Sequence, residues 1–567
     1  MKAARGPRLG IWLAICFHTP LVATGLYRNS FDATTHMFLA DHYRRSWFAL
    51  WEPRWFGGFS ISSYPPLAHQ VLALLSIPFG HDRAFAILLL ATLIALPAAV
   101  WRFAGIFVAP AAASAAAVLA AFLPGIALAA YSYGQLPTLV SLSLTLVLVS
   151  ECTRFVERGG RLRLALTTAL AGTAFAAHHA TPVLFFPPAL LAALTTVIVG
   201  VEGEVRMMRI RRAGTAITAC AVAGVVVIAA FWIWVSGGIH QAFIPHNSRN
   251  NLLTDFAAQS QYLWAVYGIV PALALSGVWR NRDRRSIALA ILAGVLAVIG
   301  LGGTTPLPAL LFGAQWQWLT YDRFALWGAV AMLPLAGAAV SGLFSARLAL
   351  SRLAGIAALA VLSVYAGANG LASLDLSRST PDLRPIAQFM NAGRTPWRYQ
   401  TFGLGEAAAQ LGYLTPATTI DGAYHSARRL PELTGSGIGM LDAALWWDPS
   451  GRVLRQVLAR ANAYSMRWAF VAEPRYEPYL MAAGFHSRGT LAGGIDVWEN
   501  TAAPPLSPAA LSFHSPDVAG ILWGTLPLAA AFFALVLALA QRRIIAIDAR
   551  PREQWMPQDV AYPAAAT

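Results

Sequence analysis

Apolar segments of membrane length recur along most of the sequence, and no other feature restricts the fold so strongly. The 567 residues are 57% hydrophobic and 12% charged, with a mean hydropathy of +0.55. A membrane-spanning helix needs roughly 20 mostly apolar residues, so the sequence predicts a polytopic α-helical membrane protein with about 12–14 transmembrane helices. The candidate segments are 9–27, 66–79, 84–100, 106–123, 135–150, 164–181, 182–199, 213–235, 262–278, 286–301, 323–343, 353–371 and 518–540.

Arginine is concentrated in short clusters between the apolar segments. The net charge is +15, but the clusters are typical of cytoplasmic loops and not of a nucleic-acid surface, so we expect no nucleic-acid partner. They occupy residues 154–163, 206–212, 279–285, 347–352 and 541–543. The positive-inside rule then predicts a multi-pass protein of the cell (plasma) membrane with these segments outside: 28–65, 178–182, 236–261, 302–322 and 372–517.

Three parts follow from this topology. Residues 1–371 form the predicted transmembrane module with residues 28–65 as its first external loop, and residues 518–567 form a final transmembrane helix and cytoplasmic tail. Residues 372–517 differ in kind, because "WRYQTF", "MRWAFVAE" and "GGIDVWEN" are typical of strands and "SGRVLRQVLARANAY" has a helical period. We expect a small extracytoplasmic α/β domain there. Both chain ends are predicted to lie inside, which requires an even number of crossings, whereas thirteen candidate segments are found. Either one segment between residues 84 and 130 is re-entrant or partial, or one segment has been split or missed.

Missing residues and motifs exclude several enzyme classes. Lys2 is the only lysine, which removes Schiff-base chemistry and the phosphate-binding lysine of a P-loop. Cys16, Cys152 and Cys220 lie in or beside apolar segments, so neither a disulfide framework nor a cysteine zinc site is indicated. D-x-D, H-E-x-x-H, Walker A and G-x-S-x-G motifs are absent. A phosphate group must therefore be held by arginine, histidine or backbone.

The polar stretch "NSFDATTHMFLADHY" at residues 29–43 directly follows the first apolar segment. Asp32 and His36 are four residues apart and share a face if the stretch is helical, and Asp41 and His42 follow within two turns. One interpretation is an N-cap aspartate opening an interfacial helix with solvated side chains. The other is a catalytic loop in which Asp32 and His36 are the reactive groups.

The same loop continues as "WEPRWFGGFSISSYPPLAHQVLALL", with interfacial aromatic residues, Gly-Gly and a Pro-Pro-Leu helix start. An acidic residue after the first membrane helix followed by this pattern resembles the GT-C glycosyltransferases. Within them it resembles the bacterial integral membrane group described as 6-pyruvoyl-tetrahydropterin synthase-related. The resemblance is strongest over residues 20–150 and looser at "HHATP" and "TYDRFALW". It implies a polyprenyl-phosphate-linked sugar as donor, chemistry at the extracytoplasmic face, and a catalytic role for Asp32.

Glycosyl transfer needs a carboxylate to accept a proton or position a metal, and cations to stabilise the leaving phosphate. Asp32 supplies the first, and a divalent cofactor (Mg or Mn) at Asp32 and Asp41 is left open. Arg323 stands at the start of a predicted helix, where its guanidinium suits a lipid phosphate. In the alternative interpretation, Arg323 is an interfacial arginine that reaches the lipid headgroups or pairs with Asp322. The other predicted donor-binding residues are Tyr321, Arg249, His246 and His240.

A further set of side chains is suited to the sugar or the acceptor. Each has an ordinary alternative, because Tyr and Gln are common at membrane interfaces, His pairs at helix ends, and Trp pairs in cores. The predicted residues are Tyr64, Gln135, His178, His179, Trp446 and Trp447.

We therefore expect a membrane glycosyltransferase that moves a sugar from a polyprenyl-phosphate donor in the membrane lipid to an extracytoplasmic acceptor, namely a cell-envelope glycan, a glycolipid or a protein. One alternative is a transporter or flippase of lipid-linked saccharides, whose polar residues would line a pathway. It is disfavoured because the apolar segments carry few charges. The other alternative is a non-catalytic scaffold that presents residues 372–517, which leaves the first-loop cluster unexplained.

Overall fold

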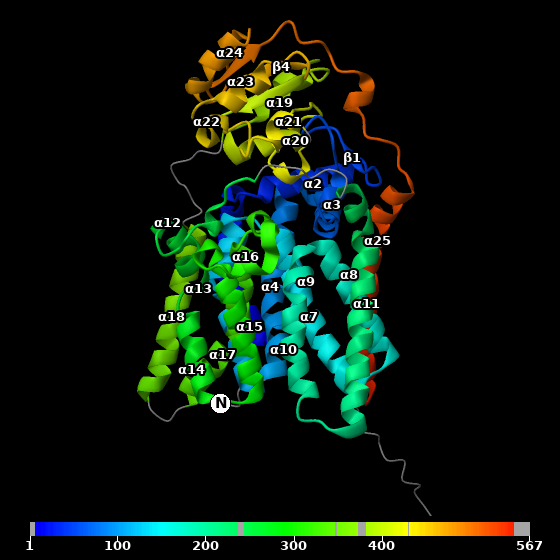
Figure 1. Ribbon diagram of the computed structural model, residues 1–567, viewed down its shortest axis with the longest axis vertical. Helices are drawn as coiled ribbons and strands as arrows, with labels where there is room; N and C mark the ends of the chain where they lie inside the picture. Colours follow the sequence, from blue (N-terminus) through cyan, green and yellow to red (C-terminus); the bar gives the residue numbers. More distant parts are fainter. Residues whose placement is uncertain (1–5, 236–242, 346–348, 372–380, 429, 549–567) are drawn as a thin grey trace, which may run out of the picture.

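The chain folds into a helical bundle with a sheet-containing region at one end (Figure 1). The computed structural model describes residues 6–235, 243–345, 349–371, 381–428 and 430–548. The bundle helices are α1 (Arg8–Ala23), α2 (Ala33–Arg45), α3 (Leu67–Phe79), α4 (His81–Phe107), α5 (Pro110–Ala121), α6 (Pro124–Ala127), α7 (Leu136–Arg158), α8 (Arg161–Ala177), α9 (Ala180–Leu184), α10 (Phe186–Ile198), α11 (Gly203–Val235), α12 (Phe256–Gln259), α13 (Ala265–Tyr267), α14 (Val270–Arg280), α15 (Arg284–Gly300), α16 (Leu307–Phe312), α17 (Asp322–Ser345), α18 (Ala349–Leu371) and α25 (Val518–Asp548).

Seven helices in the described part of the chain are long and apolar enough to cross a membrane, or eight if the bent pair Phe256–Tyr267 and Val270–Arg280 is one span. The expected 12–14 also counted short apolar helices such as Leu67–Phe79 and Phe186–Ile198, which fall below full spanning length. The strongly bent pair, at 49°, lies at residues 256–280, whereas a re-entrant or partial segment was considered between residues 84 and 130. The chain is a polytopic α-helical membrane protein.

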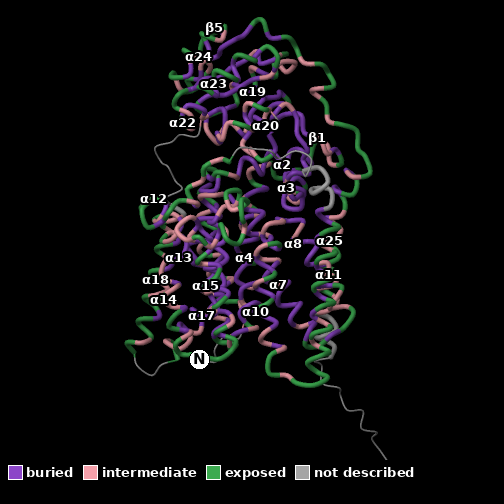
Figure 2. The backbone as a smooth tube through the Cα atoms, in the orientation of Figure 1, coloured by how far each residue is buried: buried purple, intermediate pink, exposed green. Residues whose placement is uncertain are grey.

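Helix α17 lies at the centre of the bundle, where it packs against α5, α14 and α15. Its apolar window is 89% buried, whereas those of α11, α18 and α25 are 17–28% buried, and Figure 2 shows exposed residues along these outer helices. A methyl group added to Gly277 of α14 would lie 2.0 Å from Leu335 O. Glycine therefore lets α14 approach the α17 backbone, as small residues do in membrane bundles.

The sheet region comprises residues 381–428 and 430–500 and has helices on both faces of a four-stranded sheet. The strand order is β3-β4-β6-β5, with β3 and β4 parallel and the other pairs antiparallel. Trp468 and Phe470 of β4 pack in the core with α19, while the alternate residues Ala469 and Val471 pack with α23. The elements are β3 (Arg398–Phe402), β4 (Met466–Val471), β5 (His486–Leu491), β6 (Ile495–Glu499), α19 (Arg384–Asn391), α20 (Leu411–Leu414), α21 (Pro431–Thr434), α22 (Ala444–Trp447), α23 (Arg452–Leu458) and α24 (Glu477–Ala482).

The three strands and the helix predicted in this region are confirmed as β3, β4, β6 and α23. The sequence analysis missed β5, because its residues "HSRGTL" are polar and it is an exposed edge strand. A separate hairpin, β1 (Trp51–Glu52) with β2 (Phe59–Ser60), lies in the first loop, residues 28–65.

The sheet region is attached to the bundle through this first loop. Thr419 N donates to Arg54 O at 2.8 Å, and Gly57 N donates to Thr419 O at 3.1 Å. Arg54 Nη1 also donates to Gly412 O at 2.6 Å, across 358 positions of sequence. The sheet region and α2 meet at this end of the bundle, as Figure 1 shows. The first loop is therefore enclosed between the membrane helices and the sheet.

Candidate active site

Asp32 is fixed by its backbone. It directly precedes α2, and its N–H donates to Tyr133 O at 3.0 Å. The facing residue, Gly134, has a φ of +70°, and a methyl group added there would lie 2.5 Å from Ser30 Oγ. Only glycine tolerates a left-handed backbone packed this closely. The turn before α7 thus sets the position of Asp32.

The Asp32 side chain makes no capping hydrogen bond to α2, in contrast to the helix-cap interpretation. Burial raises the pKa of Asp32 to about 6, with the charge of Arg323 lowering it and that of Asp322 raising it. The beginnings of α2 and α17 therefore bring these three charged groups into one site. A carboxylate with a pKa near neutrality is suited to accept a proton in general-base catalysis.

The first residues of α17 contribute groups with unused hydrogen-bonding capacity. Gln135 Nε2 donates to Asp322 Oδ2 at 2.6 Å, and Arg323 Nη1 donates to Thr320 Oγ1 at 2.7 Å. Asp322 Oδ1 and Arg323 Nε are enclosed, and neither has a hydrogen-bond partner within the described residues. The described chain shows no ion pair between Asp322 and Arg323 either. Enclosed polar groups without partners are rare in proteins and indicate a place for a ligand or ordered water.

His36 and Tyr64 extend the site between α2 and α3. His36 Nδ1 lies 3.0 Å from His69 Nε2, and His36 Nε2 is enclosed without a partner in the described structure. Burial is the main cause that lowers the pKa of His36, so its imidazole is neutral near pH 7. The Tyr64 ring makes edge contacts with His36 and with Tyr424 of the sheet region. The charges of Asp32 and Arg323 both act on Tyr64, so it faces the same site.

His178 and His179 lie at the junction of α8 and α9, within electrostatic range of Arg323. His178 Nδ1 is 2.9 Å from Thr181 Oγ1, and His178 is also within range of His36. Both histidines therefore lie within electrostatic range of Arg323, and their role in binding the sugar or the acceptor stays a prediction.

His246 and Arg249 border the site on the side of α17. The charges of Asp322 and Arg323 act on His246, and Arg249 donates from Nε to Leu319 O at 2.9 Å. Burial lowers the pKa of Arg249 to about 10. His240, grouped with them in the sequence analysis, lies outside the described residues.

Tyr321, Trp446 and Trp447 have surroundings unlike those expected of them. Tyr321 is fully buried, and its hydroxyl donates to Trp316 O at 2.7 Å, so its polar group is already engaged in packing the loop. Trp446 and Trp447 lie in α22, where their rings contact each other and Trp447 packs on the core of the sheet region. Neither tryptophan has a described contact with the residues around Asp32.

Asp41 belongs to a separate ion-pair network. Its carboxylate accepts hydrogen bonds from Arg54 Nη1 and Arg45 Nε, both at 2.5 Å, and lies 3.1 Å from His81 Nε2. Both of its oxygens are thus engaged with arginine or histidine nitrogens, which does not fit a metal shared with Asp32. Across the described chain, no three His, Cys, Asp or Glu side chains gather in a metal-binding arrangement. The divalent cofactor stays a prediction, and no chemical step below depends on it.

Glu406 and His69 were missed by the sequence analysis. Glu406 reaches α2 from the sheet region, where its backbone O accepts a hydrogen bond from Thr34 Oγ1 at 3.2 Å. Burial, followed by the charge of Asp32, raises the pKa of Glu406 to about 8. No local pattern marks Glu406, which is 372 positions from Thr34, and His69 lies in an apolar helix where sequence reasoning favours a core role.

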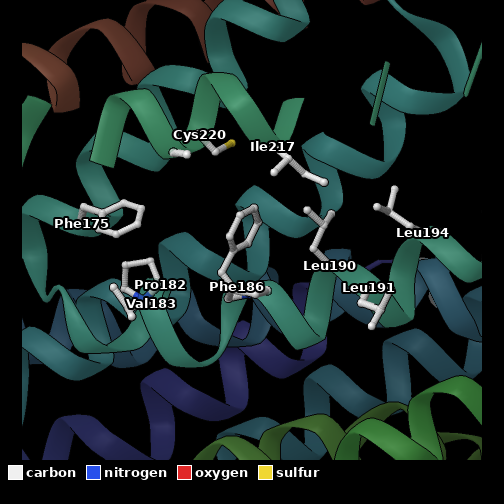
Figure 3. Close-up of a pocket in the computed structure, with 11 residues that line it drawn as sticks. Phe175, Pro182, Val183, Phe186, Leu190, Leu191, Leu194, Ile217 and Cys220 are labelled. Atoms are coloured by element: carbon white, nitrogen blue, oxygen red, sulfur yellow. The ribbon is translucent and has the colours of Figure 1, made fainter. Parts of the chain in front are cut away.

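An apolar groove lies between α9, α10 and α11 (Figure 3) and has a volume of about 380 Å³. Phe186 and Leu190 of α10 point toward Ile217 and Cys220 of α11. His178 and His179 directly precede α9 in the sequence, but neither lines the groove. Its lining is Phe175, Pro182, Val183, Phe186, Pro187, Leu190, Leu191, Leu194, Ile217, Cys220 and Ala221.

No protein-family model matches the chain, and no curated protein matches it. Solved structures do. The arabinofuranosyltransferase AftD from Mycobacteria matches 86% of this chain at 14% identity with a TM-score of 0.53, and the match spans 40% of AftD. ArnT from Cupriavidus metallidurans bound to undecaprenyl phosphate matches 87% of this chain and 99% of its own at 12% identity and a TM-score of 0.53. The apo oligosaccharyltransferase of Archaeoglobus fulgidus matches 88% and 75% at 12% identity and a TM-score of 0.50.

At 12–14% identity these likenesses establish the fold. The chain has the GT-C fold, and the fold class expected from the sequence resemblance is confirmed. The narrower resemblance to the 6-pyruvoyl-tetrahydropterin synthase-related group is not shown by these comparisons and stays a prediction.

Proposed function

We propose that this protein is a glycosyltransferase that moves a sugar from a polyprenyl-phosphate donor to an acceptor at the extracytoplasmic face. The observation that carries the proposal is the half-buried Asp32 carboxylate, which makes no capping hydrogen bond and lies within electrostatic range of Arg323 at one end of a membrane bundle. The neighbours support it, since AftD is named as an arabinofuranosyltransferase, the archaeal protein as an oligosaccharyltransferase, and ArnT as bound to undecaprenyl phosphate.

In the proposed reaction, the Asp32 carboxylate accepts the proton of the acceptor hydroxyl. The acceptor oxygen attacks the anomeric carbon and forms the new C–O bond, while the bond from that carbon to the phosphate oxygen breaks with its electron pair on the phosphate. Attack opposite the leaving group inverts the anomeric centre. Arg323 donates hydrogen bonds to the phosphate and stabilises its developing charge, with Arg249 and His246 nearby.

The remaining polar groups would bind the sugar. Neutral His36 has an unpartnered Nε2 that suits a sugar hydroxyl. Tyr64, Gln135, His178 and His179 border the same space and offer hydroxyl, amide and imidazole groups. The acceptor would enter from the side of the sheet region, where Tyr424 and Glu406 lie.

The apolar groove fits the hydrocarbon chain of such a donor. It lies against α9, which directly follows His178 and His179 in the sequence, and is lined almost entirely by apolar side chains. A polyprenyl phosphate placed with its phosphate at Arg323 would direct its chain into the groove. A soluble nucleotide sugar would have no use for a groove that faces the lipid.

The experiment is a transfer assay with the purified protein in lipid nanodiscs and radiolabelled polyprenyl-phosphate hexose. Release of polyprenyl phosphate together with a labelled product supports the proposal. Leu191→Trp fills the groove and should reduce donor use, whereas Leu275→Trp, on the exposed face of α14, should not. Movement of intact donor across the bilayer without cleavage would favour a flippase, and neither reaction would favour a scaffold.

Localisation needs its own test, because the positive-inside rule alone places residues 372–517 outside. In a cysteine-free background, an impermeant maleimide should label Ser487→Cys on exposed β5 in intact cells. Glu202→Cys, exposed between α10 and α11, should react only after lysis. The reverse pattern would contradict extracytoplasmic transfer.

A further inference from the structure

Arg428 of the sheet region is a buried cation with unused donors. Arg428 is 3% exposed, and its Nη1 donates a hydrogen bond to Ile438 O at 2.7 Å. Its Nε and Nη2 are enclosed and have no hydrogen-bond partner in the described structure. Burial lowers the pKa of Arg428 to about 10, with the charge of Asp421 opposing the shift. An enclosed guanidinium that is not fully paired is costly and persists where it serves a ligand.

Two imidazoles and a second arginine lie near Arg428. His425, three positions earlier, interacts electrostatically with Arg428, His246 and Arg249, and burial lowers its pKa to about 3, so its imidazole is neutral near pH 7. The connection to the bundle is direct. The Arg249 guanidinium lies 4.9 Å from the centre of the Phe243 ring, and a methyl group on Gly437, next to the Arg428 acceptor Ile438, would lie 3.0 Å from Phe243 O. Two arginines from distant segments thus flank one junction.

Acidic groups facing this junction do not pair directly with its arginines. Asp421 Oδ2 accepts hydrogen bonds from Asp442 N and Gln400 Nε2, at 2.9 and 3.4 Å. Asp322, on the bundle side, accepts a hydrogen bond from Gln135. Neither carboxylate forms an ion pair with Arg428 or Arg249 among the described residues. Both guanidinium groups therefore lack a directly bonded carboxylate there.

We infer that Arg428 and His425, together with Arg249 and His246, form a second oxyanion-binding site adjacent to the one at Arg323. The biological meaning of this inference rests on the proposed function, but the site itself is defined by the positions of these four side chains. Guanidinium and imidazole donors are suited to a phosphate or a carboxylate. The oxyanion has two sources: a second phosphate on a diphosphate-linked donor, or an acidic group on the acceptor.

The substrate consequence is the same for both sources. A reaction that used only one lipid monophosphate and a neutral acceptor would leave the Arg428 junction without a ligand. The structure thus points to a donor and an acceptor that together carry two oxyanions, one bound by the membrane helices and one bound by the sheet region.

Binding is tested on the full-length protein in nanodiscs by calorimetry and thermal unfolding. The probes are polyprenyl monophosphate, polyprenyl diphosphate, inorganic phosphate and glucuronate. Arg428→Gln is compared with Arg475→Gln, whose exposed side chain pairs with Glu473. We expect Arg428→Gln to weaken binding of the second oxyanion at least about tenfold, since hydrogen bonds to charged groups contribute this much. Arg475→Gln should bind as the wild type does.

The pattern across probes identifies the source. Tighter binding of diphosphate than of monophosphate, lost in Arg428→Gln, assigns the site to the donor. Binding of phosphate or glucuronate in the presence of saturating polyprenyl monophosphate, lost in Arg428→Gln, assigns it to the acceptor. Anion binding that is unchanged in Arg428→Gln overturns the inference.

A stability measurement separates a ligand-binding arginine from a structural one. Without added anion, Arg428→Gln should unfold at the same or a higher temperature than the wild type, because an incompletely paired charge has been removed, and the anion-induced rise in Tm should shrink. A lower Tm with an unchanged anion-induced rise would make Arg428 structural. Should Arg428→Gln not fold, His425→Gln is the second variant, and undiminished anion binding there overturns the site. If transfer activity is absent but these binding results hold, the proposed function fails and the oxyanion site stands.

Discussion

An aspartate lies at each end of helix α2, and the surroundings of the two aspartates shift their pKa values in opposite directions. Asp32, at the beginning, has no hydrogen-bonded cap, and burial raises its pKa to about 6. Asp41, near the end, accepts hydrogen bonds from Arg45 and Arg54. These two arginines and the hydrogen bond with His81 hold the pKa of Asp41 below its usual range, although burial alone would raise it. One helix thus presents a carboxylate poised to take a proton and another locked as an anion.

The difference follows from the partners that the rest of the chain supplies. Arg54 is fully buried and also holds Glu52 through Nε and Nη2, at 2.7 and 2.6 Å. At Asp32 the nearest cation, Arg323, is bonded only to Thr320 among the described residues, and its Nε is unpartnered. Paired charges at the Asp41 end stabilise the fold, whereas unpaired ones at the Asp32 end leave capacity for a substrate.

The largest expected effect is on catalysis at Asp32. Asp32→Asn keeps the size of the side chain but removes the base, so transfer should slow by about a hundredfold or more. Thermal stability should not fall, because no ion pair is lost. The exposed Asp382→Asn serves as control and should transfer at the wild-type rate. Near-wild-type turnover of a folded Asp32→Asn protein would remove Asp32 from the mechanism.

A substitution in the ion-pair network at the Asp41 end of α2 should instead affect the stability of the protein. Arg54→Ala leaves Asp41 and Glu52 buried without their shared cation, at a cost of about 3–5 kcal/mol in the free energy of unfolding. Arg44→Ala is the matched control, since Arg44 is 47% exposed and 4.0 Å from Asp41, and should cost less than about 1 kcal/mol. Scanning fluorimetry in detergent gives both values. Equal Tm values for the two variants would show that the network is not a structural support.

A smaller effect is expected for the donor. Arg323→Lys keeps the charge but loses the planar pair of donors, so the KM for polyprenyl-phosphate sugar should rise about tenfold. Arg249→Lys provides a comparison within the same site, because two of its nitrogens already bond to backbone carbonyls, and its effect should be smaller. An unchanged KM in Arg323→Lys would assign Arg323 to packing or topology.

The smallest expected effect is a shift of pH dependence. A base must be deprotonated to act, so kcat/KM should rise with pH through an apparent pKa near 6, the value expected for Asp32. Arg323 lowers this pKa and Asp322 raises it. The acidic limb should therefore move to higher pH in Arg323→Gln and to lower pH in Asp322→Asn. Shifts of the same sign in both variants would separate the titrating group from Asp32.

Much of the site followed from sequence because its residues stand out locally. Asp32, His36, Tyr64 and His178 are polar residues at the ends of apolar segments, and the structure gathers them around Arg323. The sequence could not show which of these polar side chains would form ion pairs with other residues in the folded protein. Asp41 was considered as a metal ligand with Asp32, and only the structure shows that Arg54 and Arg45 engage it.

Long-range contacts account for what sequence reasoning missed. Glu406, Tyr424 and Arg428 lie in short helical turns or loops of the sheet region with no periodic pattern. Glu406 and Tyr424 are placed by contacts with α2 and the first loop, and Arg428 by a hydrogen bond to Ile438. Tyr321 and Trp447 had suitable chemistry, but their environments engage them in packing. The edge strand β5 shows the same limit for the fold, because its exposed polar residues lack the alternation that marks a strand.

The backbone pairing between the first loop and Thr419 has a consequence for biosynthesis. The loop leaves the ribosome early, yet Gly412, which binds Arg54, is made 358 residues later. At about 5–20 residues per second, the loop waits roughly 20–70 s for its partner. During translation Arg54 can therefore pair with Asp41 and Glu52 early, but the contacts between the first loop and the sheet region form only after most membrane helices have been made.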